Sequence, residues 1–197
     1  MNKIQTAILI SIFVLSSGAN AALVGRLETA PGSGVYQAYY DDVASLTWLT
    51  DAGAAGGSLS WSEASNWTAT LVVDGVGGWR LPDTDVNCGD VYNCTGSEMG
   101  SLFYTALGNT AHFLTNTGDF INVFQRDFWS ATGYEAIPGW AWYFQMGNGS
   151  QSITDKEVDL YAWAVHSGDV ADIPLPAAAW LFGSALLGLG AIKRKKS

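Results

Sequence analysis

Two apolar runs, one at each end of the chain, confine any globular fold to the residues between them. The first run covers residues 7–15, follows Lys3 and is closed by the small residues of Ala19-Asn20-Ala21. A cationic start, an apolar run and a small-residue site are typical of a secretory signal peptide, which signal peptidase removes. We therefore predict a signal peptide at residues 1–21 and an exported domain that begins at Ala22.

The second run lies near the C-terminus, where residues 177–192 contain no charged side chain. As a helix, a run of this length spans roughly 24 Å, slightly less than the hydrocarbon layer of a membrane at about 30 Å. Prolines before the run and basic residues after it mark its ends: Pro174, Pro176, Lys193, Arg194, Lys195 and Lys196. By the positive-inside rule the basic residues stay in the cytoplasm. We expect a single membrane span with the body of the protein outside.

The same C-terminal residues resemble a known sorting signal. Residues 174–189 read Pro-Leu-Pro-Ala-Ala-Ala-Trp-Leu-Phe-Gly-Ser-Ala-Leu-Leu-Gly-Leu before the basic cluster and are similar to the PEP-CTERM family, although Leu175 stands where the name-giving motif has Glu. The resemblance implies a tail at residues 173–197 that an exosortase processes, in a Gram-negative bacterium that makes exopolysaccharide. A plain membrane anchor is the alternative, because span length and basic flank fit both. Either interpretation places the body in the cell envelope, at the cell surface or in the extracellular matrix.

Charge is distributed unevenly between the body and the ends. The chain has 9 basic and 18 acidic residues, and all the acidic residues lie in residues 22–172 with only four of the basic ones. The formal charge of this body is therefore −14. Such a surface repels nucleic acid and sulfated or phosphorylated polymers, since close approach adds like charge to like. We exclude nucleic acid as a partner on this ground.

Two segments of the body carry the signals of a helix. Ser60 and Glu63 have the spacing of a capping box and precede apolar residues at three- and four-residue intervals, which predicts a helix over residues 61–71. Thr95 and Glu98 repeat this spacing and predict a second helix that ends at the next Gly-Asn pair. Its inward-facing residues are expected to be Met99, Leu102, Phe103 and Leu107.

Strand-like segments lie on both sides of these helices. β-Branched and aromatic residues concentrate at 35–40, 46–49, 128–132, 140–146 and 161–165. A Gly-Asn-Gly sequence after the fourth of these segments supplies a hairpin turn. No repeat of solenoid length is visible. We predict one α+β domain over residues 22–172, with two helices and a small, mainly antiparallel sheet rich in aromatic residues.

Seven short motifs, taken in order, give the body a family resemblance. They are Leu46-Thr-Trp-Leu49, Trp61-Ser-Glu-Ala64, Gly78-Trp-Arg-Leu-Pro82, Glu98-Met-Gly-Ser-Leu-Phe103, Phe128-Trp-Ser-Ala-Thr132, Trp142-Tyr-Phe144 and Tyr161-Ala-Trp-Ala-Val165. Over roughly residues 35–170 the chain resembles the Lcl-type C-terminal domain family. The resemblance implies a C-type-lectin-like fold. The named member of the family is the head of an adhesin that binds sulfated glycans, a property that we do not expect here because the body lacks the cations for it.

The aromatic segment at 140–146 has two interpretations. On a strand, Trp140, Trp142 and Phe144 share one face, while Tyr143 lies on the other. Buried aromatic residues fill most small cores, so packing is the first interpretation, and a flat face that stacks on sugar rings is the second. For the second interpretation the candidate ligand-binding residues are Trp140, Trp142 and Tyr143.

A loop at residues 83–94 carries alternating oxygen ligands and the only two cysteines. Its acidic and amide side chains resemble the first part of a calcium loop: Asp83, Asp85, Asn87 and Asp90. An EF-hand would have glycine at Cys88 and glutamate at Cys94, so a solvated acidic turn is the alternative to a calcium site. In an oxidising compartment the two cysteines predict a local disulfide that contributes roughly 2 kcal/mol.

The sequence contains no recognisable catalytic pattern. His112 and His166 are the only two histidines, and neither lies in a nucleophile or metal motif. We therefore expect no enzyme activity, with a glycan-active enzyme as the third alternative because 18 acidic residues allow chance carboxylate pairs. The predicted function is that of an exported surface or matrix protein whose lectin-like domain contacts exopolysaccharide or a protein partner. A purely structural matrix component is the main alternative.

Overall fold

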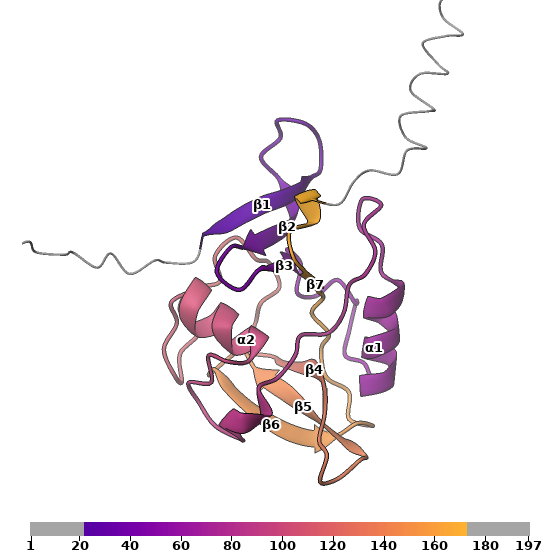
Figure 1. The fold of residues 1–197 in the computed structure, drawn as a ribbon, viewed down its shortest axis with the longest axis vertical. Helices are drawn as coiled ribbons and strands as arrows, with labels where there is room; N and C mark the ends of the chain where they lie inside the picture. The colour runs from indigo at the N-terminus through magenta and orange to yellow at the C-terminus, as the bar shows by residue number, and fades with distance from the viewer. Residues whose placement is uncertain (1–21, 173–197) are drawn as a thin grey trace, which may run out of the picture.

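The computed structural model describes residues 22–172 (Figure 1). The predicted signal peptide and sorting tail, at 1–21 and 173–197, lie outside the described residues. Within 22–172, no helix is long and apolar enough to cross a membrane. The strands are β1 (Leu23–Glu28), β2 (Tyr36–Asp41), β3 (Leu46–Leu49), β4 (Asp127–Gly133), β5 (Trp140–Gln145), β6 (Ser150–Asp155) and β7 (Val165–Ser167). The helical elements are α1 (Trp61–Thr70), η1 (Val86–Cys88), α2 (Glu98–Gly100), η2 (Ser101–Ala106) and η3 (Val170–Asp172).

The strands form two antiparallel sheets, one more than the sequence predicted. The first sheet has four strands in the order β1-β2-β3-β7, and the second has three in the order β4-β5-β6. The chain returns to the first sheet at its end, because β7 pairs with β3 rather than with the β5–β6 hairpin. In Figure 1 the two sheets lie at opposite ends of the molecule, with α1 and α2 on opposite sides. The predicted α+β class is confirmed.

Trp163 joins the two sheets in the centre of the core. Its side chain is fully buried, with ring centroids 5.4 Å from Trp48 of β3 and 5.6 Å from Phe128 of β4. A third ring, Phe120, packs edge-on at 5.2 Å. The indole nitrogen donates to the carbonyl of Leu49 at 2.7 Å, so the one polar atom of the side chain is also satisfied. Both sheets therefore depend on one side chain from the segment between them.

Helix α1 begins where the capping box predicts. The Ser60 hydroxyl accepts from the backbone of Glu63, and the Glu63 carboxylate accepts from the backbone N–H of Ser60. Ala64 is fully buried against the second sheet, and the Trp61 indole N–H donates to the carbonyl of Ser130 on β4 at 2.8 Å. The helix is therefore fixed both by its own first turn and by contact with β4.

The start of the second helix differs from the prediction. Ser97, not Thr95, is the N-terminal cap, and its hydroxyl makes no capping bond to the helix backbone. The predicted capping box does not form, because Glu98 pairs its carboxylate with Arg80. The hydroxyl of the actual cap, Ser97, bonds to Gln151 instead of to the helix backbone. From residue 101 the turns widen into the π-helical segment η2. The predicted inward face is confirmed, since Met99, Leu102, Phe103 and Leu107 are all buried.

Close packing of α2 on the loop before it makes Gly100 a sensitive position. A β-carbon at Gly100 would overlap the carbonyl oxygen of Cys94, whereas one at Gly57 would meet nothing within 4 Å. Alanine in place of glycine inside a helix ordinarily stabilises by about 1 kcal/mol. We expect Gly100→Ala to destabilise by more than about 2 kcal/mol, because the clash involves backbone that cannot move aside. Urea unfolding checks this, with Gly57→Ala as the near-neutral control; equal stability of the two variants contradicts it.

An ion pair fastens the first strand to the end of the domain. Arg26 donates from two guanidinium nitrogens to the two carboxylate oxygens of Asp169, at 2.6 and 2.5 Å. These hydrogen bonds lower the pKa of Asp169 despite the opposing effect of burial. A carboxyl whose pKa is lowered by folding stabilises the fold above its unfolded pKa, and this contribution disappears as the pH falls through the folded pKa.

We expect the free energy of unfolding to fall below about pH 4, and to fall less steeply there in Asp169→Asn, because the amide has no proton to take up. Urea unfolding between about pH 6 and about pH 3 measures this slope. Glu157→Gln, at an exposed position, serves as the matched control and should keep the wild-type slope. Identical slopes in the wild type and Asp169→Asn would contradict the assignment.

Candidate functional site

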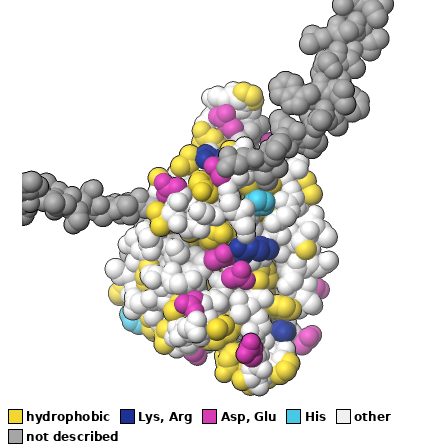
Figure 2. All heavy atoms as spheres, in the orientation of Figure 1, with side chains coloured by type: hydrophobic (Ala, Val, Ile, Leu, Met, Phe, Trp, Pro, Cys, Tyr) yellow, Lys and Arg dark blue, Asp and Glu magenta, His cyan; other side chains and the backbone are white. Residues whose placement is uncertain are grey.

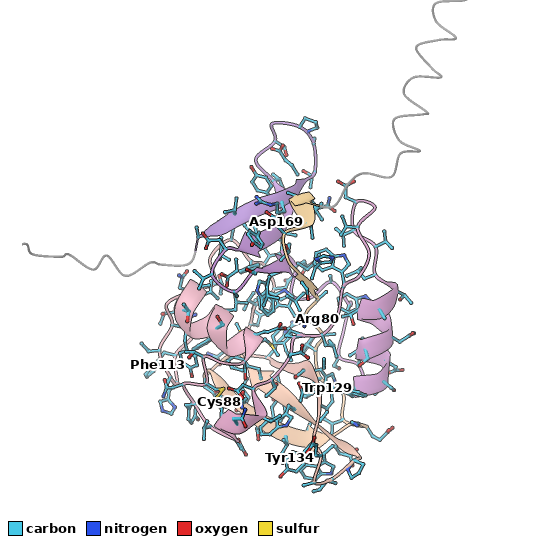
Figure 3. All side chains as sticks on the ribbon, viewed as in Figure 1. Arg80, Cys88, Phe113, Trp129, Tyr134 and Asp169 are labelled. Carbon is cyan, nitrogen blue, oxygen red and sulfur yellow. A yellow bond between two sulfur atoms is a disulfide. The ribbon has the colours of Figure 1, made fainter. Side chains whose placement is uncertain are left out.

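A cavity of about 530 Å³ opens between the loop after β4 and the turn η1. Its lining residues are Val86, Gly133, Tyr134, Glu135, Ala136 and Trp142. In Figure 3, Tyr134 lies at the end of the molecule opposite Asp169. On the face shown in Figure 2, apolar side chains gather at the same end, where Figure 1 places the β4–β5 loop. The cavity therefore combines an apolar surface with a free carboxylate.

Backbone hydrogen bonds hold the loop that carries Tyr134. The Tyr134 N–H donates to the carbonyl of Trp140 at 2.9 Å, and the Tyr134 carbonyl accepts from Ile137 at 3.2 Å. The Lys156 ammonium donates to the carbonyl of Pro138 at 2.8 Å and ties the loop to the residue after β6. With the backbone fixed in this way, the Tyr134 ring has a defined position before any ligand arrives.

An aromatic pair forms one wall of the cavity. The rings of Tyr134 and Trp142 meet edge to face, with centroids 5.7 Å apart and an interplanar angle of 80°. Trp142 is 4% exposed, so most of its ring supports the fold and a small part reaches the cavity. Its indole nitrogen is buried and has no hydrogen-bond partner among the described residues. Tyr134 is half-buried and Glu135 is exposed, so these two side chains are the accessible polar groups of the wall.

The three predicted aromatic ligand-binding residues lie in different places. Trp142 lines the cavity, whereas Trp140 and Tyr143 are not among its lining residues. Tyr143 lies on the other face of β5 beside a second buried cluster, and burial raises the pKa of its phenol. Both faces of β5 are covered, since Ala141 is as buried as Phe144. Tyr134 and Glu135 were missed because a loop of this length gives no periodic signal; a tyrosine directly after a strand was the only hint.

Two of the four predicted calcium ligands, Asp85 and Asn87, contact each other. The Asp85 carboxylate accepts from the backbone and the side-chain amide of Asn87, at 2.9 and 3.0 Å. Asp83 lies 3.4 Å from the guanidinium of Arg80, and burial raises the pKa of its carboxyl. Neither Asp83 nor Asp90 belongs to a group of three His, Cys, Asp or Glu side chains with adjacent ligand atoms among residues 22–172. Calcium binding at this loop stays a prediction.

The cluster that does form is Asp85 with Cys88 and Cys94. The two sulfur atoms are 2.08 Å apart, and the predicted disulfide is confirmed. Bonded sulfur offers no thiolate to a metal. The bridge instead closes the ring of residues 88–94, and its Cys88 ends the turn η1 that begins with Val86 of the cavity wall.

Gln151 anchors the same loop from β6. Its side chain is 1% exposed, and the amide nitrogen donates to the carbonyls of Asp85 and Gly89 at 3.1 and 2.7 Å. The amide oxygen accepts from the Ser97 hydroxyl at 2.5 Å. Every polar atom of a buried amide is thus used to fix the loop. This role was not predicted from the sequence, because Gln151 lies in β6, a strand without a clear sequence signal.

Of the four basic side chains in residues 22–172, two are paired with carboxylates of the domain itself. Arg80 donates to both oxygens of Glu98 at 2.7 Å, and Arg26 pairs with Asp169. Figure 2 shows a face on which the dark-blue cations are few and mostly lie beside magenta acidic groups. This arrangement agrees with a body of −14 and offers no basic patch on that face for a polyanion.

Comparison with known families gives the residues their context. The model of the Lcl C-terminal domain matches residues 37–166, more than half of the chain. The chain belongs to this family. No curated protein matches it. Membership of the Lcl C-terminal domain family indicates an extracellular or surface protein. The cavity at Tyr134 lies within the matched residues, as does the disulfide.

Loss of the disulfide should affect both stability and the cavity. We expect Cys88→Ser with Cys94→Ser to lower the free energy of unfolding by roughly 2 kcal/mol, because the open loop has more freedom in the unfolded chain. Guanidinium unfolding measures the change, and the same value should follow from reducing the wild type. Amide exchange at Gly89, whose N–H donates to the Val86 carbonyl at 3.2 Å, should quicken in the double variant while exchange at Trp48 stays slow. Equal quickening at both residues would mean that the bridge supports the whole core.

Proposed function

We propose that this domain binds extracellular polysaccharide non-covalently, at the cavity formed by Tyr134, Glu135 and Trp142. The observation that carries the proposal is the aromatic pair beside an exposed carboxylate in a preformed cavity of about 530 Å³. A sugar ring has apolar C–H faces and hydroxyl groups at its edge. The aromatic wall suits the faces, and the Glu135 carboxylate accepts from the hydroxyl groups.

The size and stiffness of the site support recognition of one or two sugar units. Ligand pockets commonly enclose about 300 to 1,000 Å³. The disulfide and Gln151 fix one side of this cavity, and the bonded Tyr134 loop fixes the other. A site that is ordered in advance loses little conformational entropy on binding. Weak contacts to a repeating polymer then suffice, because many copies of the unit are present.

Charge restricts the class of polysaccharide. A body of −14 repels polymers with dense sulfate or phosphate groups. The proposed ligand is therefore a neutral polysaccharide or one with widely spaced carboxylates. The proposed ligand therefore differs from the sulfated glycans that the named adhesin of the family binds.

The proposal extends to how the protein reaches its ligand. The apolar N-terminal run and the PEP-CTERM-like tail support export by signal peptidase and sorting by an exosortase, in a Gram-negative envelope or matrix. The extracellular or surface location that the family indicates is consistent with this route.

Tyr134→Ala is the variant that tests the site. Because Tyr134 is half-buried and in a loop, the fold should survive its loss, whereas Trp142→Ala would empty a core position and cost about 3 to 5 kcal/mol. We expect Tyr134→Ala to weaken polysaccharide binding about three- to tenfold, the value of one aromatic contact. A glycan array with neutral, uronate-bearing and sulfated polymers finds the ligand, and calorimetry measures the affinity.

Tyr92→Ala is the matched control, since Tyr92 is 38% exposed and does not line the cavity. It should bind as the wild type does, and Tyr134→Ala should keep the wild-type thermal midpoint. An array without hits would reject recognition and favour a purely structural matrix role. Cleavage of an oligosaccharide by the protein would favour the enzyme alternative instead.

A further inference from the structure

Arg126 precedes β4 and differs from the other arginines of residues 22–172. Its guanidinium lies over the ring of Tyr161 at 4.0 Å and beside that of Phe124 at 4.8 Å. Among the described residues, no carboxylate lies within 4.0 Å of it and no acceptor bonds to its side chain. Arg26 and Arg80, in contrast, each make two-pronged bonds to a carboxylate. Arg126 thus carries up to five N–H donors that the domain itself does not use.

Arg126 lines a small cavity. It measures about 260 Å³ and is lined by Gly53, Gly56, Gly57, Asn122, Arg126 and Tyr161. A β-carbon at Gly56 or Gly57 would meet nothing within 4 Å, so the glycine wall leaves open space. On this wall, no side chain fills the cavity or accepts a hydrogen bond from the Arg126 guanidinium.

The Asp51 carboxylate bonds to two residues of the cavity lining. Asp51 accepts from the backbone of Gly53 and from the side-chain amide of Asn122, both at 2.7 Å. This bond uses the amide nitrogen of Asn122 and leaves its carbonyl oxygen as an acceptor. The cavity thus presents a cation with free donors next to one neutral acceptor.

An arginine held on aromatic rings is ready to bind a planar oxyanion. The rings restrict the long side chain before a ligand arrives, so less rotamer entropy is lost on binding. The guanidinium fork matches a carboxylate with two parallel hydrogen bonds. The stacked ring faces do not compete for these N–H donors, which lie at the edge of the guanidinium plane.

We propose that Arg126 binds the carboxylate of a uronic acid unit in an extracellular polysaccharide. A sugar suits the surroundings better than an acidic peptide side chain does, because Phe124 is 52% exposed beside the guanidinium and offers an apolar face to the ring. The Asn122 carbonyl accepts from a sugar hydroxyl. Long-range repulsion by the body is screened within about 8 Å at physiological salt, so an isolated carboxylate reaches the cavity while a dense polyanion does not.

This site is separate from the cavity at Tyr134. The two lie at opposite ends of β4, roughly 20 Å apart by the rise of a strand. Binding of a uronate at Arg126 therefore does not require the Tyr134 site. Loss of one site in a variant should leave the other intact, and this makes the two proposals distinguishable.

The test titrates the full-length protein with methyl glucuronide and follows the arginine Nε–Hε signals by NMR. We expect a saturable shift of the Arg126 signal, with the signals of Arg26 and Arg80 unchanged. Methyl glucoside, which lacks the carboxylate, should cause no such shift. Arg126→Gln should weaken glucuronide binding by about tenfold or more, because charge-assisted bonds are lost. Arg126→Lys keeps the charge but not the fork, so it should also bind less tightly than the wild type.

Lys156→Gln is the matched control, since it removes the same charge at another cation without a carboxylate within 4.0 Å among residues 22–172. It should leave the glucuronide-induced shift of the Arg126 signal as in the wild type, and so should Tyr134→Ala, because neither residue lines the Arg126 cavity. The proposal is overturned if methyl glucoside shifts the Arg126 signal as glucuronide does, or if Arg126→Lys and Arg126→Gln retain full affinity for glucuronide at an unchanged thermal midpoint. Tighter binding of an aspartyl peptide than of glucuronide would also overturn it and assign the cavity to a protein partner.

Discussion

The contact of Trp163 with Trp48 and Phe128 is the interaction on which the two-sheet arrangement depends. Each sheet gives one large ring to the same buried indole, so the two sheets share one core at this point. The neighbours of Trp163 in the chain, Ala162 and Ala164, are small and buried, which lets an extended segment pass between the sheets. Because the indole N–H is bonded to Leu49, the ring is fixed in orientation as well as in depth.

Rigidity of this centre extends to β4, the strand between the two candidate sites. The Trp129 N–H donates to the carbonyl of Tyr161, and the Tyr161 N–H donates to that of Asp127, at 2.9 and 3.0 Å. The other edge of β4 is paired with β5. A strand held along both edges keeps the loops at its ends in place, and a preorganised site needs this support. The candidate residues Tyr134, Glu135 and Arg126 thus lie just outside the ends of β4, while their positions are set by the core.

Sequence patterns correctly predicted those features that residues close together in the chain determine. The capping box at Ser60 gave α1 to within one residue, and the cysteine spacing gave the disulfide. Predictions failed where a residue distant in the sequence determines the structure. The capping box at Thr95 does not form because Glu98 pairs with Arg80. Strands β1 and β6 were not predicted because they contain too few apolar residues to be recognised without the strands that they pair with. For the sites, Trp142 was predicted from its strand, but Tyr134, Glu135 and Arg126 depend on loops meeting in space.

The ion pair between Arg26 and Asp169 holds the beginning and the end of the described chain in the same half of the molecule (Figure 3). Tyr134 lies at the far pole. A cell surface or matrix attached to either end of residues 22–172 would therefore lie on this side of the domain. The opposite end of the domain would then face away from this surface, and the cavity at Tyr134 would be open to a polymer in the surrounding medium.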